Sequence, residues 1–191
     1  IWAWRPRRLE KIRSFVDHIL ALFPFEPKLA EINKVSCEFV GHPVVSKKIP
    51  AVQDIVVLRK KLGICNNVPI MAVMPGSRRS EIKNNLPIFL STIKMVAAVY
   101  TDLVFVIPAV SEVEELVVSK VSKFCEKTGL NVLVLSQKSF DIANDFENLK
   151  FSLFRTAAIA LAASGTVVLE LARTGVPMVV GYRAHYINEL L

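Results

Sequence analysis

The sequence predicts an α/β fold built on doubly wound parallel sheets. Short, wholly apolar runs at 68–74, 103–107 and 157–162 have the composition of strands that are buried on both faces. Amphipathic segments of helical length follow the first two runs, and a further helix pattern opens at about Thr166. Strands that alternate with helices in this way favour a parallel sheet with helices on both of its faces.

The elements follow from local signals along the chain. Pro27 suits the first turn of a helix, and Gly63 suits the end of one. In order, we expect a strand at 16–22, a helix at 27–33, a strand at 37–40, a linker from 41 to 50, a helix at 52–62, a strand at 68–74, a long helix reaching about residue 100, a strand at 103–107, a helix at 112–127, strands at 132–135 and 157–162, a helix from about 166, and a strand at 178–180.

The turn Ser164-Gly165-Thr166 is the first candidate site. Gly165 permits a tight turn at the end of the apolar run, and a helix that starts at Thr166 directs unpaired N–H groups and its positive dipole end at the turn. These features favour a phosphate. Glu170, about one turn further on, has a carboxylate that can accept two hydrogen bonds from a ribose diol. The same pattern also fits an ordinary capped turn between a strand and a helix.

A second turn of this kind follows the run at 68–74. Gly76 and Ser77 precede the long helix, and Arg78 adds a planar, permanently charged group that suits a diphosphate. The spacing is not that of a P-loop, and on their own Arg78 and Arg79 also fit solvated loop charges. Because strand ends meet at one edge of a parallel sheet, the two turns together predict a single nucleotide diphosphate site.

An ordered set of motifs runs along nearly the whole chain. Its segments are IWAWRP at 1–6, ALFPFE at 21–26, FVGHP at 39–43, MPGSRRSEI at 74–82, LAASGT at 161–166 with Leu169 and Glu170, GVPMVV at 175–180 and GYR at 181–183. Taken in this order, the set resembles the lipid-A-disaccharide synthase family. Arg7 departs from the pattern, because the family more often has glycine after Arg-Pro.

The resemblance implies an inverting glycosyltransferase of the two-domain GT-B type, with one partial and one near-complete domain in this chain. Such an enzyme transfers 2,3-diacylglucosamine from its UDP donor to 2,3-diacylglucosamine 1-phosphate, giving lipid A disaccharide 1-phosphate and UDP. It requires no cofactor and no metal. The family's proposed catalytic aspartate lies in an Asp-x-Pro-Asp-type motif that this sequence lacks, so we expect a fragment that is inactive alone.

The resemblance also implies a domain plan. Residues 1–45 correspond to the end of the N-terminal, acceptor-side domain, 46–66 to a linker and connecting helix, and 67–191 to a truncated nucleotide-sugar-binding domain. It places Gly76, Ser77, Arg78, Ser164, Gly165 and Thr166 at the UDP diphosphate, Glu170 at the ribose, and His42 and Arg183 near the interdomain cleft.

Charge and composition favour anionic partners. The chain of 191 residues has a net charge of +7 and a pI near 9.5. The segment 2–15 interleaves basic and aromatic residues, so it fits either a membrane surface or a helix with one buried stripe. We expect a cytoplasmic enzyme, peripheral at the inner face of the bacterial inner membrane and dimeric at full length, with no nucleic-acid partner. The absence of any Cys-x-x-Cys pair favours reduced thiols over a metal site.

Two other functions stay open. A UDP-sugar 2-epimerase of the same architecture shares a nucleotide site but uses other acid and base residues. A non-catalytic module that binds a nucleotide or a membrane is the second alternative, and its binding is indifferent to changes at Arg78 or Glu170.

Overall fold

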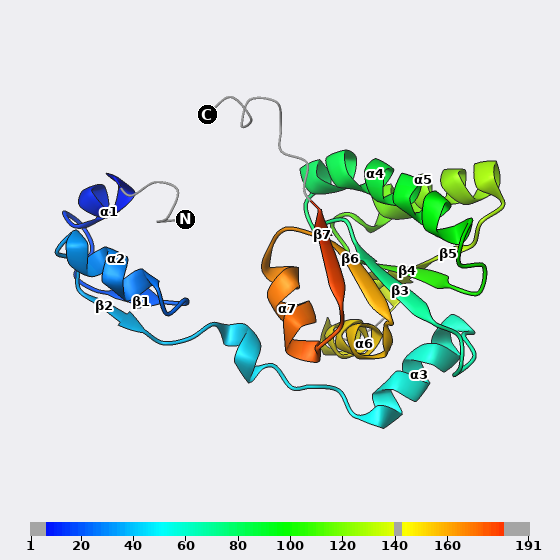
Figure 1. Ribbon diagram of the computed structural model, residues 1–191, viewed down its shortest axis with the longest axis horizontal. Coiled ribbons are helices and arrows are strands. Elements are labelled where there is room, and N and C mark those ends of the chain that lie inside the picture. The colour runs from blue at the N-terminus through cyan, green and yellow to red at the C-terminus, as the bar shows by residue number, and fades with distance from the viewer. Residues whose placement is uncertain (1–6, 140–142, 182–191) are drawn as a thin grey trace. The chain divides into compact units, whose positions relative to one another are not determined.

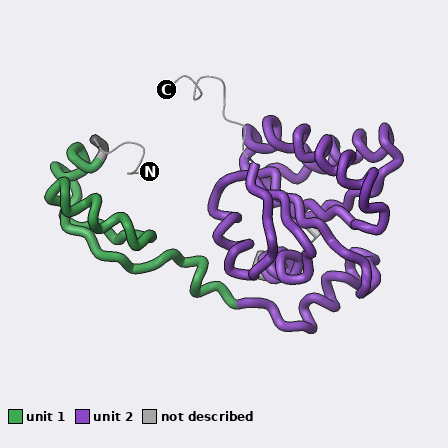
Figure 2. Tube along the Cα trace, viewed as in Figure 1, with its two compact units in different colours: residues 1–48 green, residues 49–191 purple. Residues whose placement is uncertain are grey.

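The computed structural model describes residues 7–139 and 143–181, with the side chains of residues 7–8, 139 and 143–145 left aside. The chain forms two compact units, residues 1–48 and 49–191 (Figure 2). The predicted domain boundaries at 45 and 66 stay predictions, although the first lies close to the division between the units.

The first unit contains a strand-helix-strand motif. Strands β1 and β2 are parallel, with Ile19 opposite Cys37, and helix α2 connects them. In α1, Leu9 is buried while Glu10 and Lys11 are exposed, as in a helix with one buried stripe. Contact of this segment with a membrane stays a prediction. The elements are α1 (Arg7–Ile12), β1 (Ile19–Ala21), α2 (Glu26–Ile32), β2 (Cys37–Phe39) and the 3-10 helix η1 (Pro43–Ser46).

The second unit is a five-stranded parallel sheet with the order β5-β4-β3-β6-β7. The predicted α/β fold with a doubly wound parallel sheet is confirmed. Its elements are α3 (Val52–Leu62), β3 (Ile70–Met74), α4 (Arg79–Ala97), β4 (Val104–Ala109), α5 (Glu114–Thr128), β5 (Val132–Ser136), η2 (Gln137–Ser139), α6 (Ala143–Thr156), β6 (Ile159–Ala163), α7 (Thr166–Thr174) and β7 (Met178–Gly181).

Helices cover the two faces of this sheet (Figure 1). Alternate residues of each strand point to opposite faces, so Val73 packs with α4 and α5, while its neighbour Ala72 packs with α3, α6 and α7. Residues 70–74 of β3 are all buried, because this central strand has helices on both sides. The double burial explains the unbroken apolar run in the sequence.

Two helices of the second unit differ from what the sequence predicts, α6 in its presence and α3 in its packing. Helix α6 was not predicted, although Phe146, Leu149 and Leu153 have helical spacing and are buried in the core. Helix α3, predicted as a connecting helix, packs against α6 through the fully buried Leu58. Burial of Leu58 therefore makes α3 part of the second unit.

Candidate nucleotide site

The site begins with the strand order of the second unit. Strands β3 and β6 are hydrogen-bonded neighbours, with Met74 opposite Ala162. From β3 the chain continues to β4 on one side, whereas from β6 it continues to β7 on the other. The carboxyl ends of β3 and β6 therefore flank a topological switch point, which is where open parallel sheets bind their ligands.

A pocket of about 420 Å³ lies at this switch point. It brings together all the residues predicted to contact the diphosphate and the ribose, although they come from two turns far apart in the sequence. That they bind a nucleotide stays a prediction. The lining residues are Met74, Gly76, Ser77, Arg78, Glu81, Pro108, Val110, Phe146, Lys150, Ala163, Ser164, Gly165, Thr166, Val167 and Glu170.

The turn after β3 is occupied by a carboxylate of the protein itself. Glu81 Oε2 accepts hydrogen bonds from the backbone N–H of Ser77 at 2.9 Å and of Arg78 at 3.2 Å. Its Oε1 accepts from Arg78 Nη1 at 2.8 Å. Glu81 thus caps α4 from the third position of the helix. The donors that we expected to face a phosphate are engaged by Glu81 in this structure.

Glu81 also explains the glycine of this turn. Gly76 has φ +126°, and a Cβ added there would lie 2.5 Å from Glu81 Cβ and 2.6 Å from Oε2. The buried Asn85, one turn further along α4, donates from Nδ2 to the carbonyl of Pro75 at 3.0 Å. The first turns of α4 therefore hold the loop through Glu81 and Asn85, and the contact with Glu81 leaves room only for glycine at position 76.

The electrostatics of the turn keep Glu81 ionised. Partial burial acts to raise the pKa of this carboxyl group, but hydrogen bonds from Ser77 and Arg78 and the Arg78 guanidinium outweigh it. The pKa of Glu81 therefore lies below its ordinary value. The Arg78 side chain is 80% exposed although its guanidinium pairs with Glu81, so this charge is accessible to an incoming anion.

The turn after β6 differs from the turn after β3 in how its helix begins. Gly165 is the N-cap of α7, and among the described residues no side chain makes a cap hydrogen bond there. Ser164, Gly165 and Thr166 are exposed at the pocket. The positive end of the α7 dipole therefore faces the pocket without a carboxylate cap of the kind that Glu81 provides for α4.

Glu170 lies one turn into α7 and pairs with Lys150 of α6. The distance from Lys150 Nζ to Glu170 Oε2 is 3.2 Å, and the two side chains are only 13% and 12% exposed. Lys150 also contacts Glu147 Oε1 at 2.6 Å. Neither Lys150 nor Glu81 is among the site residues predicted from the sequence.

Signals for both residues are present in the sequence. Glu81 stands three residues after Arg78, which is the spacing of a carboxylate that caps a helix start. Lys150 follows Leu149 in the apolar pattern of α6, and this helical pattern places the lysine beside the core.

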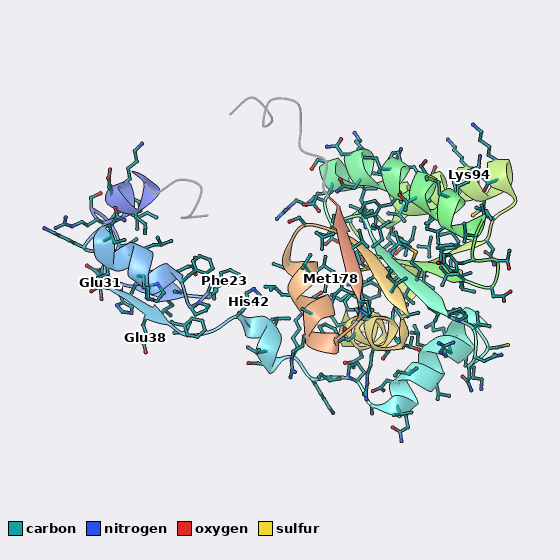
Figure 3. The ribbon with its side chains drawn as sticks, viewed as in Figure 1. Phe23, Glu31, Glu38, His42, Lys94 and Met178 are labelled. Carbon is teal, nitrogen blue, oxygen red and sulfur yellow. The ribbon has the colours of Figure 1, made fainter. Side chains whose placement is uncertain are left out.

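Two further residues, His42 and Arg183, were predicted near the site. His42 belongs to the first unit, where its Nδ1 accepts a hydrogen bond from Val44 N at 3.1 Å and so caps η1. Its ring lies beside Phe23, with 6.0 Å between the ring centroids (Figure 3). These contacts give His42 a local role in positioning its loop, and its place at an interdomain cleft stays a prediction. Arg183 lies outside the described residues.

Among the residues that the structure describes, no helix has the length and apolar character to cross a membrane. Within the same part of the chain, no three or more histidine, cysteine, aspartate or glutamate residues gather as metal ligands would.

The fold is that of Rossmann-like α/β proteins, which include GT-B glycosyltransferases. A similar solved structure is a glycosyl transferase family 9 protein from Veillonella parvula, with a TM-score of 0.53 and 10% identity over 91% of this chain and 60% of the other. The S. aureus MnaA–UDP co-structure has a TM-score of 0.58 and 17% identity over 94% and 47%. At these identities the likeness shows the fold alone.

The sequence comparisons go further than the fold. The family model for lipid-A-disaccharide synthetase matches residues 1–191, and the chain belongs to that family. The lipid-A-disaccharide synthase of Rhodospirillum centenum is 40% identical over 100% of this chain and 44% of its own length. That of Ruegeria pomeroyi is 38% identical over 99% and 46%. The chain thus spans less than half the length of these relatives.

Proposed function

We propose that this chain carries the UDP-binding part of a lipid-A-disaccharide synthase. In the complete reaction, 2,3-diacylglucosamine passes with inversion from its UDP donor to the 6-hydroxyl of 2,3-diacylglucosamine 1-phosphate. The observation that carries the proposal is the pocket at the switch point, which is lined by the turns at Gly76 and Gly165 and by Glu170. Family membership supports the choice of UDP as the nucleotide.

Each side of the pocket has a distinct part in the proposal. The start of α7 binds the diphosphate, since the dipole and backbone N–H groups there favour an anion. The exposed Arg78 guanidinium closes on the same group from the other turn and stabilises the charge that develops on departing UDP. The Glu170 carboxylate accepts hydrogen bonds from the ribose hydroxyls.

The proposal divides the chemistry between this segment and the rest of the enzyme. Inverting transfer needs a base that removes the proton of the attacking 6-hydroxyl. We place that base outside these 191 residues, as the missing Asp-x-Pro-Asp-type motif suggests, and propose that this chain is inactive alone. We likewise propose that the whole protein acts as a dimer at the cytoplasmic face of the inner membrane.

Calorimetric titration of UDP tests the nucleotide site. Arg78→Ala and Glu170→Ala should each weaken binding by about 1.5–3 kcal/mol, the contribution of a hydrogen bond to a charged group. Arg79→Ala is the matched control, because Arg79 is an exposed neighbour that does not line the pocket, and its binding should stay close to that of the parent. No binding by the folded parent, or equal effects at Arg78 and Arg79, contradicts the assignment.

A synthesis assay tests the division of the chemistry. The purified chain, prepared from a host without its own synthase, is expected to make no disaccharide from the UDP donor and the 1-phosphate acceptor. Disaccharide formation by this polypeptide would show that the base lies within it. A nucleotide site that turns over UDP-sugars without acyl chains would instead favour the epimerase class.

A further inference from the structure

Lys150 is a lysine held almost entirely within the protein at the edge of the pocket. Its ammonium group lies 2.6 Å from Glu147 Oε1, 3.2 Å from Glu170 Oε2 and 5.6 Å from the centroid of the Phe151 ring. Its side chain is 13% exposed. Burying a charged lysine costs free energy unless opposite charges compensate it. Here two carboxylates and the face of an aromatic ring contact the ammonium group.

The two carboxylates are not equivalent. Glu147 is an i,i+3 neighbour on the same helix, is 42% exposed and does not line the pocket. Glu170 comes from α7, is 12% exposed and lines the pocket together with Lys150. The contact between Lys150 and Glu170 therefore links two helices at the wall of the pocket, where solvent screens it least.

We infer that Lys150 is a positioning residue that fixes the Glu170 carboxylate in the orientation that receives a vicinal diol. The inference rests on the proposed nucleotide function, and it identifies the ribose end of the pocket. A carboxylate has about four lone-pair positions, so the contact of Glu170 with Lys150 does not by itself exclude hydroxyl donors.

Direct contact of Lys150 with a phosphate is the competing assignment, and the charges disfavour it. One ammonium group already faces two carboxylates, so Lys150, Glu147 and Glu170 together carry a net negative charge when all three are ionised. A phosphate gains little from such a cluster. Neutral hydroxyl donors, in contrast, suit the carboxylate that the lysine holds.

The test compares UDP with 2′,3′-dideoxyuridine diphosphate, which keeps both phosphates and lacks the diol. Affinities are measured by calorimetry for the full chain and for Lys150→Met, Glu170→Gln, the double variant and Glu147→Gln. Lys150→Met should lower UDP affinity about tenfold and leave dideoxy-UDP affinity within about twofold. The double variant should bind UDP no more weakly than Glu170→Gln, since both changes remove one interaction. Glu147→Gln, the control, should stay within about twofold of the parent.

The nucleotide selectivity ratio is the deciding readout, because a purely structural lysine would not change it. If Lys150→Met loses affinity for UDP and dideoxy-UDP by the same factor, the ratio of the two affinities is unchanged and the inference is overturned. If Lys150→Met does not fold, Lys150→Gln is measured in the same way and judged by the same ratio. Failure of the folded parent to bind either nucleotide overturns the proposed function itself, whereas parent binding of UDP with no Lys150 dependence overturns only the role of this lysine.

Discussion

Replacing Gly76 with alanine tests the account of the turn after β3. The new Cβ would lie 2.5 Å from Glu81 Cβ, and rotating the Glu81 side chain cannot relieve this contact because Cβ is fixed to the backbone. The backbone at residue 76 also has φ +126°, which L side chains rarely adopt. The turn or the first turn of α4 must therefore shift.

The magnitude follows from these two effects. An unfavourable backbone conformation costs about 1–3 kcal/mol. A shift that also breaks the cap formed by Glu81 costs about 1 kcal/mol more. We expect Gly76→Ala to lower the free energy of unfolding by about 2–4 kcal/mol, measured by urea denaturation with far-UV circular dichroism.

Gly129→Ala is the matched control, because Gly129 has φ +71° and an added Cβ there meets nothing within 4 Å. It should cost only the backbone strain, about 1–2 kcal/mol. The difference between the two variants combines the clash with Glu81 and the less favourable φ of residue 76. Equal losses, or a Gly76→Ala variant as stable as the parent, would refute the reasoning.

Three further changes in the second unit test other interactions. The pKa of Glu81 is lower in the folded than in the unfolded protein, so its ionised form stabilises the fold above the unfolded pKa, and this stabilisation is lost as the pH falls through the folded pKa. When unfolding is measured at stepwise lower pH, the difference in free energy of unfolding between the parent and Glu81→Gln should shrink below about pH 4.5. A difference that stays constant with pH contradicts this expectation. Arg59→Lys should lower the free energy of unfolding in urea by about 1.5–3 kcal/mol, because the buried guanidinium donates hydrogen bonds to the carbonyls of Cys65 and Val68 and to Thr156 Oγ1. Lys60→Ala, at an exposed position, is the control and should be nearly neutral. Phe154→Ala should cost about 3–5 kcal/mol by the same method, since Phe154 is fully buried, and a loss below about 1 kcal/mol would contradict its place in the core.

Prediction from the sequence succeeded where the signal is local. The apolar run at 68–74 and the small residues before Gly165 predict strands that end in turns, and β3, β6 and α7 follow within a few residues. Helix α6 was not predicted, although Phe146 and Leu153 lie at helical spacing. The predicted strand at 16–22 is shorter in the structure, where β1 covers only Ile19–Ala21.

The candidate site was predictable as a set of residues and not as a set of contacts. Glycine turns before helices are visible in the sequence, and so is a glutamate one turn beyond Gly165. The engagement of the α4 start by Glu81 follows a local capping spacing, whereas the contact of Glu170 with Lys150 depends on how side chains meet in space. The second contact joins residues of different helices, so no spacing rule contains it.

The class of fold can be read from local sequence, because burial on both faces requires unbroken apolar strands. The strand order β5-β4-β3-β6-β7 emerges only in three dimensions, where it makes β3 and β6 neighbours and joins two turns that are distant in the chain into one pocket. The physical reason is that periodicity records which side chains are buried, whereas strand order depends on how helices α3 to α7 share the two faces of the sheet.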